Sequence, residues 1–98
     1  EDVIVFADDL EGEELRILMN PVLDHGKRLC AVFGGDEEHG FRYVIGSRIL
    51  DMRPLAKELN ETFHGRGGGK SEMVQGSVQG NESEMRAWIQ EKARKMNG

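Results

Sequence analysis

A glycine-rich stretch flanked by cations is the part of this sequence best suited to bind a ligand. It runs from His64 to Ser77 and reads HGRGGGKSEMVQGS. Successive glycines cost the folded state conformational entropy, so we expect a structural or a binding requirement there. Backbone N–H groups in a turn without side chains, with Arg66 before it and Lys70 after it, would form an anion-binding concavity. The predicted ligand therefore carries phosphate groups.

The stretch lacks the spacing of a nucleotide-binding P-loop. That motif reads G-x-x-x-x-G-K-[ST] and leads into a helix. Gly69-Lys70-Ser71 matches its end, but His64 stands where the first glycine must be. The residues after Ser71 are typical of a short strand, so we exclude a nucleoside triphosphatase site.

Residues capable of catalysis or metal binding are scattered along the chain. Cys30 lies in an apolar run, as a buried and inert thiol would. The acidic groups Asp8-Asp9 and Asp36-Glu37-Glu38 are explained by helix capping and by a solvated turn. The histidines are far apart, and we interpret them as surface loop residues: His25, His39 and His64. We therefore predict no catalytic residue, no metal site and no cofactor in this chain.

The motif GRGGGKSEMVQGSVQ resembles the glycine-rich signature of DHH-associated domains. These domains occur at the C-terminus of alanyl-tRNA synthetases and of long-form alanyl-tRNA editing proteins. The resemblance extends through RLCAVFGG, FRYVIGSRILDMRPLAKELN and the last predicted helix, roughly from Asp8 to Met96. Related domains of DHH phosphoesterases usually carry histidine after the glycines, so Lys70 favours the tRNA-linked branch. The MVQGS segment leans toward the editing proteins.

The resemblance implies a non-catalytic accessory domain that binds tRNA, with alanine-specific tRNA as the partner. It would position the tRNA for aminoacylation or deacylation carried out elsewhere, and zinc or ATP would act in those other domains. The H-x-x-x-H and C-x-x-x-H zinc elements of the editing module are absent from this sequence. Two alternatives stay open: the substrate-clamping domain of a DHH-type phosphoesterase, and a dimerisation module in which the glycines are purely structural and the chain is a homodimer.

The binding interpretation assigns contacts to a defined set of residues. Glycine backbone would approach the RNA closely, cations would supply charge, and two glutamines would bond bases or 2′-hydroxyls, which suits recognition by shape and backbone. Arg42 is a further cation that the sequence does not place. The predicted nucleic-acid-binding residues are Arg66, Gly67, Gly68, Gly69, Lys70, Gln75, Gln79 and Arg48. The structural interpretation, in which the glycines let a helix end pack against a strand, stays open beside it.

Length and composition predict one globular domain over residues 1–98. The chain has 98 residues, of which 38% are apolar and 32% charged. No apolar run approaches the ~20 residues of a membrane span, and we expect a cytoplasmic location without membrane contact. A single cysteine excludes an internal disulfide. Because the sequence begins at Glu1, we expect a piece excised from a larger protein.

Charge is distributed unevenly along the chain. The net charge is −5, which argues against generic nucleic-acid binding. Residues 1–40 contain 11 acidic and 3 basic side chains, whereas residues 41–98 contain 7 acidic and 10 basic ones. The glycine stretch lies in the basic half, so a local basic face is compatible with the acidic total.

Apolar patterning predicts the elements that position the stretch. Strands are expected at residues 3–7, 28–33, 41–46 and 73–78, the first of them covered on both faces. Helices are expected after Asp8-Asp9, after Asp51 as N-cap and after Asn81 as N-cap, the first kinked at Pro21. The predicted order is β-α-β-β-α-β-α, an α/β sandwich whose mixed sheet is flanked by helices, with the glycine run as a loop.

Overall fold

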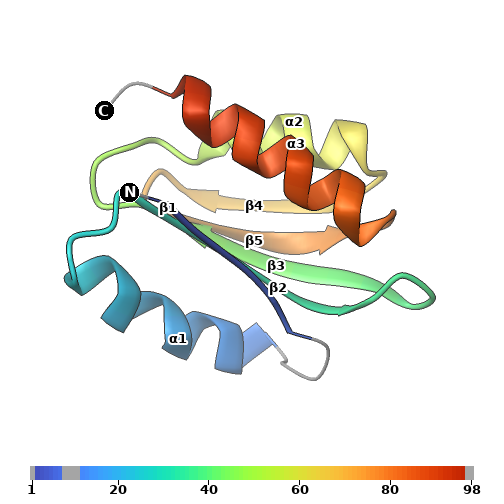
Figure 1. The fold of residues 1–98 in the computed structure, drawn as a ribbon, viewed down its shortest axis with the longest axis horizontal. Coiled ribbons are helices and arrows are strands. Elements are labelled where there is room, and N and C mark those ends of the chain that lie inside the picture. The colour runs from blue at the N-terminus through green and yellow to red at the C-terminus, as the bar shows by residue number, and fades with distance from the viewer. Residues whose placement is uncertain (1, 8–11, 97–98) are drawn as a thin grey trace.

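The computed structural model describes residues 2–7 and 12–96 of the chain, which form a five-stranded sheet flanked by helices (Figure 1). This confirms the predicted α/β class with a mixed sheet. The capping predicted for Asp8 and Asp9 lies outside the described residues. The elements are, in order, β1 (Asp2–Ala7), α1 (Gly12–Asp24), β2 (Leu29–Asp36), β3 (Gly40–Gly46), α2 (Arg53–Thr62), β4 (Arg66–Lys70), β5 (Met73–Val78) and α3 (Glu82–Lys95).

The strands are arranged in the order β1-β2-β3-β5-β4. β1 and β2 are parallel and joined through α1, whereas β2–β3, β3–β5 and β5–β4 are antiparallel pairs. The glycine run, expected as a loop, is the edge strand β4. Glycine is depleted in strands, so propensity alone predicts a loop; pairing with β5 across the turn at Ser71-Glu72 overrides it.

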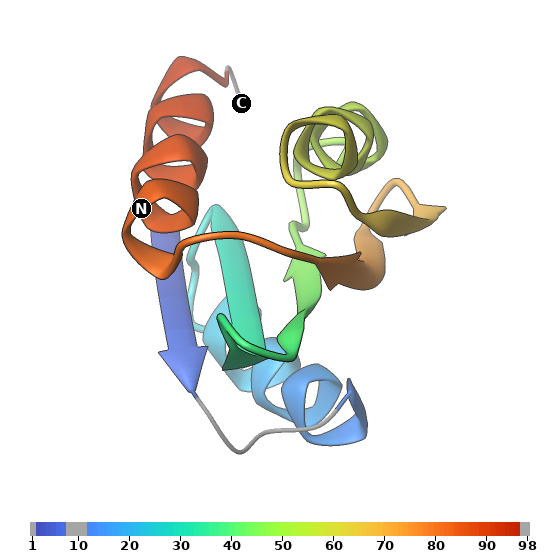
Figure 2. The same cartoon turned by 90° about the vertical axis from the view of Figure 1, so that its right-hand side faces the viewer.

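Helices cover the two faces of the sheet unequally. α1 packs on β2 and β3 from one side, while α2 lies against β4 and β5 and α3 against β1 on the other side (Figure 2). The larger core, between the sheet and α2 and α3, includes Tyr43, Leu59 and Ile89. The smaller core, under α1, includes Met19 and Val44. None of the helices in the described ranges is long and apolar enough to span a membrane.

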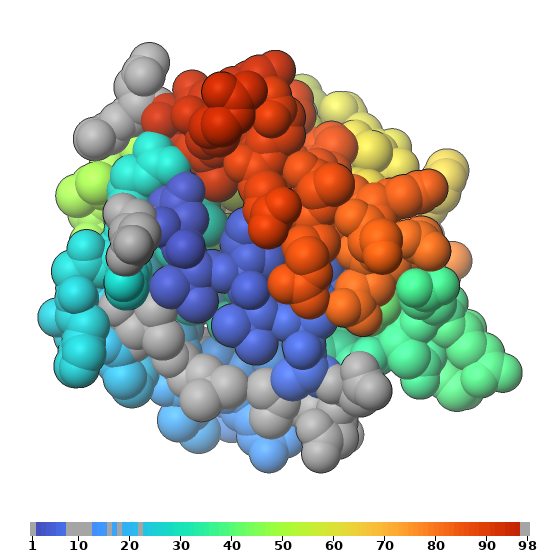
Figure 3. Space-filling view, viewed as in Figure 1, coloured from blue at the N-terminus to red at the C-terminus, as the bar shows by residue number. Residues whose placement is uncertain are grey.

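The prediction that the first strand is covered on both faces holds only in part: Ile4 and Phe6 pack against the larger core and Val3 against the smaller one, but the cover is incomplete. β1 is an edge strand, most of its residues are half-buried, and Val5 is 38% exposed. In the space-filling view β1 is visible at the surface between α3 and the α1 side (Figure 3). A continuous apolar run predicts a strand correctly but does not reveal its place in the sheet.

The helix starts follow the predicted caps in one case and differ in another. Asn81 is the N-cap of α3, and its side chain accepts a hydrogen bond of 3.1 Å from the Glu84 N–H, which confirms the prediction. For α2 the N-cap is Met52, not Asp51. Asp51 precedes this cap by one residue, and its carboxylate accepts a 3.0 Å hydrogen bond from the N–H of Arg53, the first residue of α2. α1 continues through Pro21 to Asp24.

One arginine joins the start of β1 to the end of α3. The Arg28 guanidinium donates to both Asp2 carboxylate oxygens, at 3.0 and 2.6 Å, and to the Met96 carbonyl at 2.7 Å. It also donates to the carbonyl of Ala93, within the last turn of α3. The Ala93 carbonyl also accepts a hydrogen bond of 3.2 Å from the Met96 N–H, so Arg28 adds a second, charged donor at a helix C-terminus, where a cation is favourable.

We predict that Arg28→Lys lowers the free energy of unfolding by about 1.5–3 kcal/mol, because an ammonium cannot reproduce the planar, forked set of charge-assisted hydrogen bonds. The matched control is Arg94→Lys. Arg94 also donates twice to one carboxylate, Glu91, but its side chain is 69% exposed, so we expect a change below about 0.5 kcal/mol. Urea unfolding of both variants measures the difference, and equal losses would contradict it.

Candidate functional site

The glycine stretch forms a hairpin that is fixed at both ends. Lys70 pairs with Met73 across the turn, and Arg66 pairs with Ser77 at the other end of β4. Backbone hydrogen bonds tie the turn to the connection that follows β3: the N–H groups of residues 47 and 52 donate to the carbonyls of residues 72 and 71, at 3.1 and 2.8 Å. The hairpin therefore presents its outer edge from a rigid support.

A hydrogen-bond chain anchors β4 from beneath. The Tyr43 hydroxyl donates to the Asn60 side-chain oxygen at 2.9 Å, and the Asn60 side-chain nitrogen donates to the Gly67 carbonyl at 3.2 Å. Burial raises the pKa of Tyr43, which keeps this hydroxyl protonated and able to donate. The Gly67 carbonyl is thus held by α2, the helix that covers this part of the sheet.

Three glycines of the hairpin are required by close packing. A methyl group at Gly67 would overlap the Gln75 carbonyl oxygen and lie 2.9 Å from the Tyr43 hydroxyl, and Gly67 has φ +146°. A methyl group at Gly76 would overlap the Arg66 carbonyl oxygen and lie 2.8 Å from the same hydroxyl. Gly69 has φ +156°, and its methyl would lie 2.5 Å from the carbonyl oxygen of residue 73. Packing therefore explains glycine at these three positions, but the close contacts are with the facing strand and Tyr43, not with a helix end as the structural interpretation expected.

Gly68 differs from its neighbours. A methyl group there would meet nothing within 4 Å, and its φ lies outside the left-handed range. Gly68 pairs with Gln75, and Gln75 pairs in turn with Val44 of the core under α1, so Gly68 belongs to the sheet face on that side. The fold alone gives no reason for glycine at this position.

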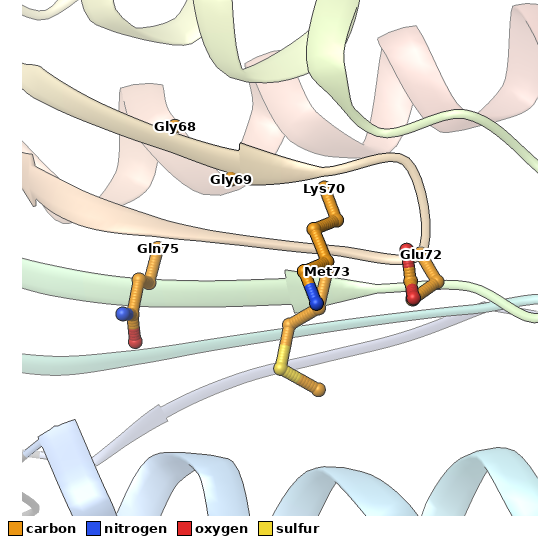
Figure 4. A pocket seen from close by; sticks show the side chains of 6 residues that line it. All are labelled: Gly68, Gly69, Lys70, Glu72, Met73 and Gln75. Carbon is orange, nitrogen blue, oxygen red and sulfur yellow. The ribbon is translucent and has the colours of Figure 1, made fainter.

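The open side of β4 and β5 forms a shallow hollow. Its volume is about 370 Å³, and it is lined by Gly68, Gly69, Lys70, Glu72, Met73 and Gln75. In Figure 4 the side chains of Lys70, Met73 and Gln75 extend from the hairpin toward the side on which α1 lies. The Lys70 ammonium and the Gln75 amide thus lie on one surface, where Gly68 leaves the strand without a side chain, and these two groups can bind an anion.

The two cations beside the glycine run are electrostatically available. Arg66 and Lys70 are exposed and have no ion-pair partner within residues 2–7 and 12–96. Arg48, the third predicted cation, lies between β3 and α2, and its guanidinium is 2.7 Å from the Asp24 carboxylate. Glu72, in the turn next to Lys70, reduces the positive potential at that end of the hairpin.

The structure brings together most of the predicted binding residues. Those on β4 and β5 share the hairpin: Arg66, Gly67, Gly68, Gly69, Lys70 and Gln75. Gln79 follows the last residue of β5, at the end away from Lys70, and its N–H donates to the Phe63 carbonyl at 2.8 Å. Arg48 lies off the hairpin, and its role stays a prediction with that of Gln79.

The groups considered for catalysis are placed as inert or peripheral. Cys30 is fully buried, and burial raises the pKa of its thiol to about 11, so the reactive thiolate is not populated at neutral pH. His39 is an exposed turn residue, and its Nδ1 lies 3.0 Å from the Asp36 carboxylate. The pKa of Asp36 is lowered, mainly by a hydrogen bond from the backbone N–H of His39. Across the described residues no three histidine, cysteine or acidic side chains are grouped to hold a metal ion.

Comparison with known proteins gives consistent matches. The model of the DHHA1 domain family matches residues 2–96. An alanine–tRNA ligase from Acholeplasma laidlawii (strain PG-8A) is 31% identical over 75 residues, which cover 76% of this chain and 9% of the ligase. The crystal structure of the C-Ala domain from Aquifex aeolicus alanyl-tRNA synthetase shares the fold, with a TM-score of 0.75, 22% identity, and coverage of 92% of this chain and 87% of that one. The resemblance inferred from the glycine motif is confirmed.

The contrast between adjacent glycines is testable by stability alone. We predict that Gly67→Ala lowers the free energy of unfolding by about 2–3 kcal/mol, through overlap with β5 and a strained φ. Gly68→Ala should change it by less than about 1 kcal/mol, because the added methyl occupies open space and restricts the unfolded chain. Denaturant unfolding measures both, and a large loss in Gly68→Ala would show that the fold requires glycine there as well.

Proposed function

Because this chain belongs to the DHHA1 domain family, we propose that it is a non-catalytic accessory domain that binds tRNA. The domain holds alanine-specific tRNA on the open side of the β4–β5 hairpin, while other domains of the parent protein carry out aminoacylation or deacylation. Tethering raises the effective concentration of the acceptor end at those domains, so positioning needs no chemistry in this chain.

The observation that carries the proposal is the open space at Gly68, between two unpaired cations. Packing and backbone conformation account for Gly67, Gly69 and Gly76 but not for Gly68. A position without a side chain lets a ribose or phosphate approach the strand closely, and Arg66 and Lys70 lie two residues before and after it on the same face. RNA is recognised largely through such backbone and shape contacts.

The chain spans 9% of the length of the alanine–tRNA ligase that it matches, so the parent's chemistry belongs to other segments. That match favours a synthetase-related parent, in which ATP would act elsewhere. Lys70 favours the tRNA-linked branch as a whole, and in an editing protein zinc would act elsewhere. A DHH-type phosphoesterase parent, in which the hairpin would clamp a substrate, is distinguished by binding of a mononucleotide in preference to tRNA.

We predict that the double variant Arg66→Glu/Lys70→Glu weakens the binding of an alanine-specific tRNA transcript by at least about a hundredfold at moderate salt. Each cation that no longer binds a phosphate removes one charge-assisted hydrogen bond, and the plot of log K against log salt should flatten by about one unit for each such phosphate. Fluorescence anisotropy over a salt series measures both quantities.

Both side chains are exposed, so the melting temperature of the double variant should stay within a few degrees of that of the unmodified chain. Unchanged affinity and salt slope in a folded variant would remove the cationic role. A change in the sedimentation of the free chain would instead indicate that this surface joins two copies.

A charge-neutral substitution tests close approach separately. We predict that Gly68→Val weakens tRNA binding by about tenfold or more while the chain stays folded, because valine suits a strand and meets no neighbour but covers the backbone. Ser83→Val, at an exposed position of α3, is the control for an added apolar side chain and should leave affinity unchanged. Equal affinity of Gly68→Val and the unmodified chain would show that the ligand does not reach β4 at this point.

A further inference from the structure

A third cation lies in register with the hairpin. Arg42 of β3 pairs with Ser77 of β5, and Ser77 pairs with Arg66 of β4, so the three residues form a row across the strands. Strand alternation places Arg42 on the same face as Val44, which belongs to the core under α1. All three residues of the row are exposed.

This row stands out from the other charges of the molecule. Among the lysine and arginine side chains that the structure describes, only four lack any partner: Arg42, Lys57, Arg66 and Lys70. Arg42, Arg66 and Lys70 lie on the same face of the sheet. Lys57 belongs to α2, which covers the opposite face. Convergent cations that the fold does not neutralise repel one another, and an external anion relieves that repulsion.

We propose that the sugar-phosphate backbone of the bound RNA crosses the strands on this face, with Arg42 as a phosphate-binding residue outside the glycine hairpin. Adjacent strands are about 4.8 Å apart, so the Arg42 and Arg66 backbones lie about 10 Å apart, within reach of neighbouring phosphates on one strand. Ser77 lies between them and donates to the same backbone. The inference rests on the proposed function and adds the direction of the RNA across the sheet.

The acidic groups around this face bound the path of the RNA. Asp36 lies two residues along β2 from the partner of Arg42, and its carboxylate accepts a hydrogen bond of 2.7 Å from the His39 N–H, which favours the ionised form. Glu72 lies at the far end, beside Lys70, and Glu13 is in the first turn of α1. The row from Arg42 to Arg66 therefore lies between Asp36 and the hairpin turn with Glu72.

The test compares three charge reversals in the 98-residue chain: Arg42→Glu, Arg66→Glu and Lys57→Glu. Each changes the net charge equally, and each replaces an exposed, unpaired cation of the described part of the chain. We expect Arg42→Glu and Arg66→Glu each to weaken binding of an alanine-specific tRNA transcript by about tenfold and to lower the salt slope by about one. Lys57→Glu should change the affinity by less than about twofold.

The outcomes separate this inference from the proposed function. Loss in Arg66→Glu without loss in Arg42→Glu overturns the path across β3 and leaves tRNA binding at the hairpin intact. Equal losses in all three variants indicate non-specific attraction and overturn the path as well. No loss in any variant overturns the proposed function itself. A melting curve for each variant shows that it is folded.

A crosslinking measurement gives a readout independent of charge. Cys30 is fully buried and does not react with the crosslinker, so a single introduced surface cysteine is the only site that the reagent labels. A photo-activated crosslinker on Ser77→Cys should attach to the tRNA transcript, whereas the same reagent on Ser83→Cys of α3 should attach far less. Equal yields from the two positions would overturn the assignment of the face.

Discussion

The architecture of the glycine edge strand β4 depends on the hydroxyl of Tyr43. It lies 2.9 and 2.8 Å from the positions that Cβ atoms at Gly67 and Gly76 would take, beside the still closer backbone of the facing strand. It also donates to Asn60, which in turn holds the Gly67 carbonyl. A side chain at either glycine would push β4 off β5, and the sheet would end at β5. The absence of two Cβ atoms is therefore what allows a strand of glycines to be an ordered edge.

Neighbouring residues of this short strand have separate roles. Gly67 and Gly69, with left-handed φ values, serve close packing, while Gly68 faces the open side and serves no packing need. The alternation of a strand makes this separation possible, because residues one apart point to opposite faces. A loop, the form expected from the sequence, would not have presented Arg66 and Lys70 on one side at a fixed spacing.

The sequence predicts the helices, four of the strands and most of the site because these depend on local patterns. Asn81 as a cap and the buried face of α2 follow from spacing of three and four residues. What could not be predicted depends on strand order. The apolar run of β1 gives no sign that the strand lies at an edge. The alternation around Arg42 indicates which sheet face its side chain is on, but not which residue of the next strand lies beside it. Ser77 and Arg42 meet only because β5 inserts between β3 and β4.

Protection of a sheet edge is the simplest structural explanation for Arg66 and Lys70, because charged residues on an edge strand discourage pairing with another chain. The two edges of this sheet argue against it. β1 presents the apolar segment VIVF, with high strand propensity, and its described charge, Asp2, is neutralised by Arg28. β4 is mostly glycine, which has a low tendency to recruit a further strand. The unpaired cations thus lie on the edge that needs protection less, which is the distribution expected if they serve a ligand.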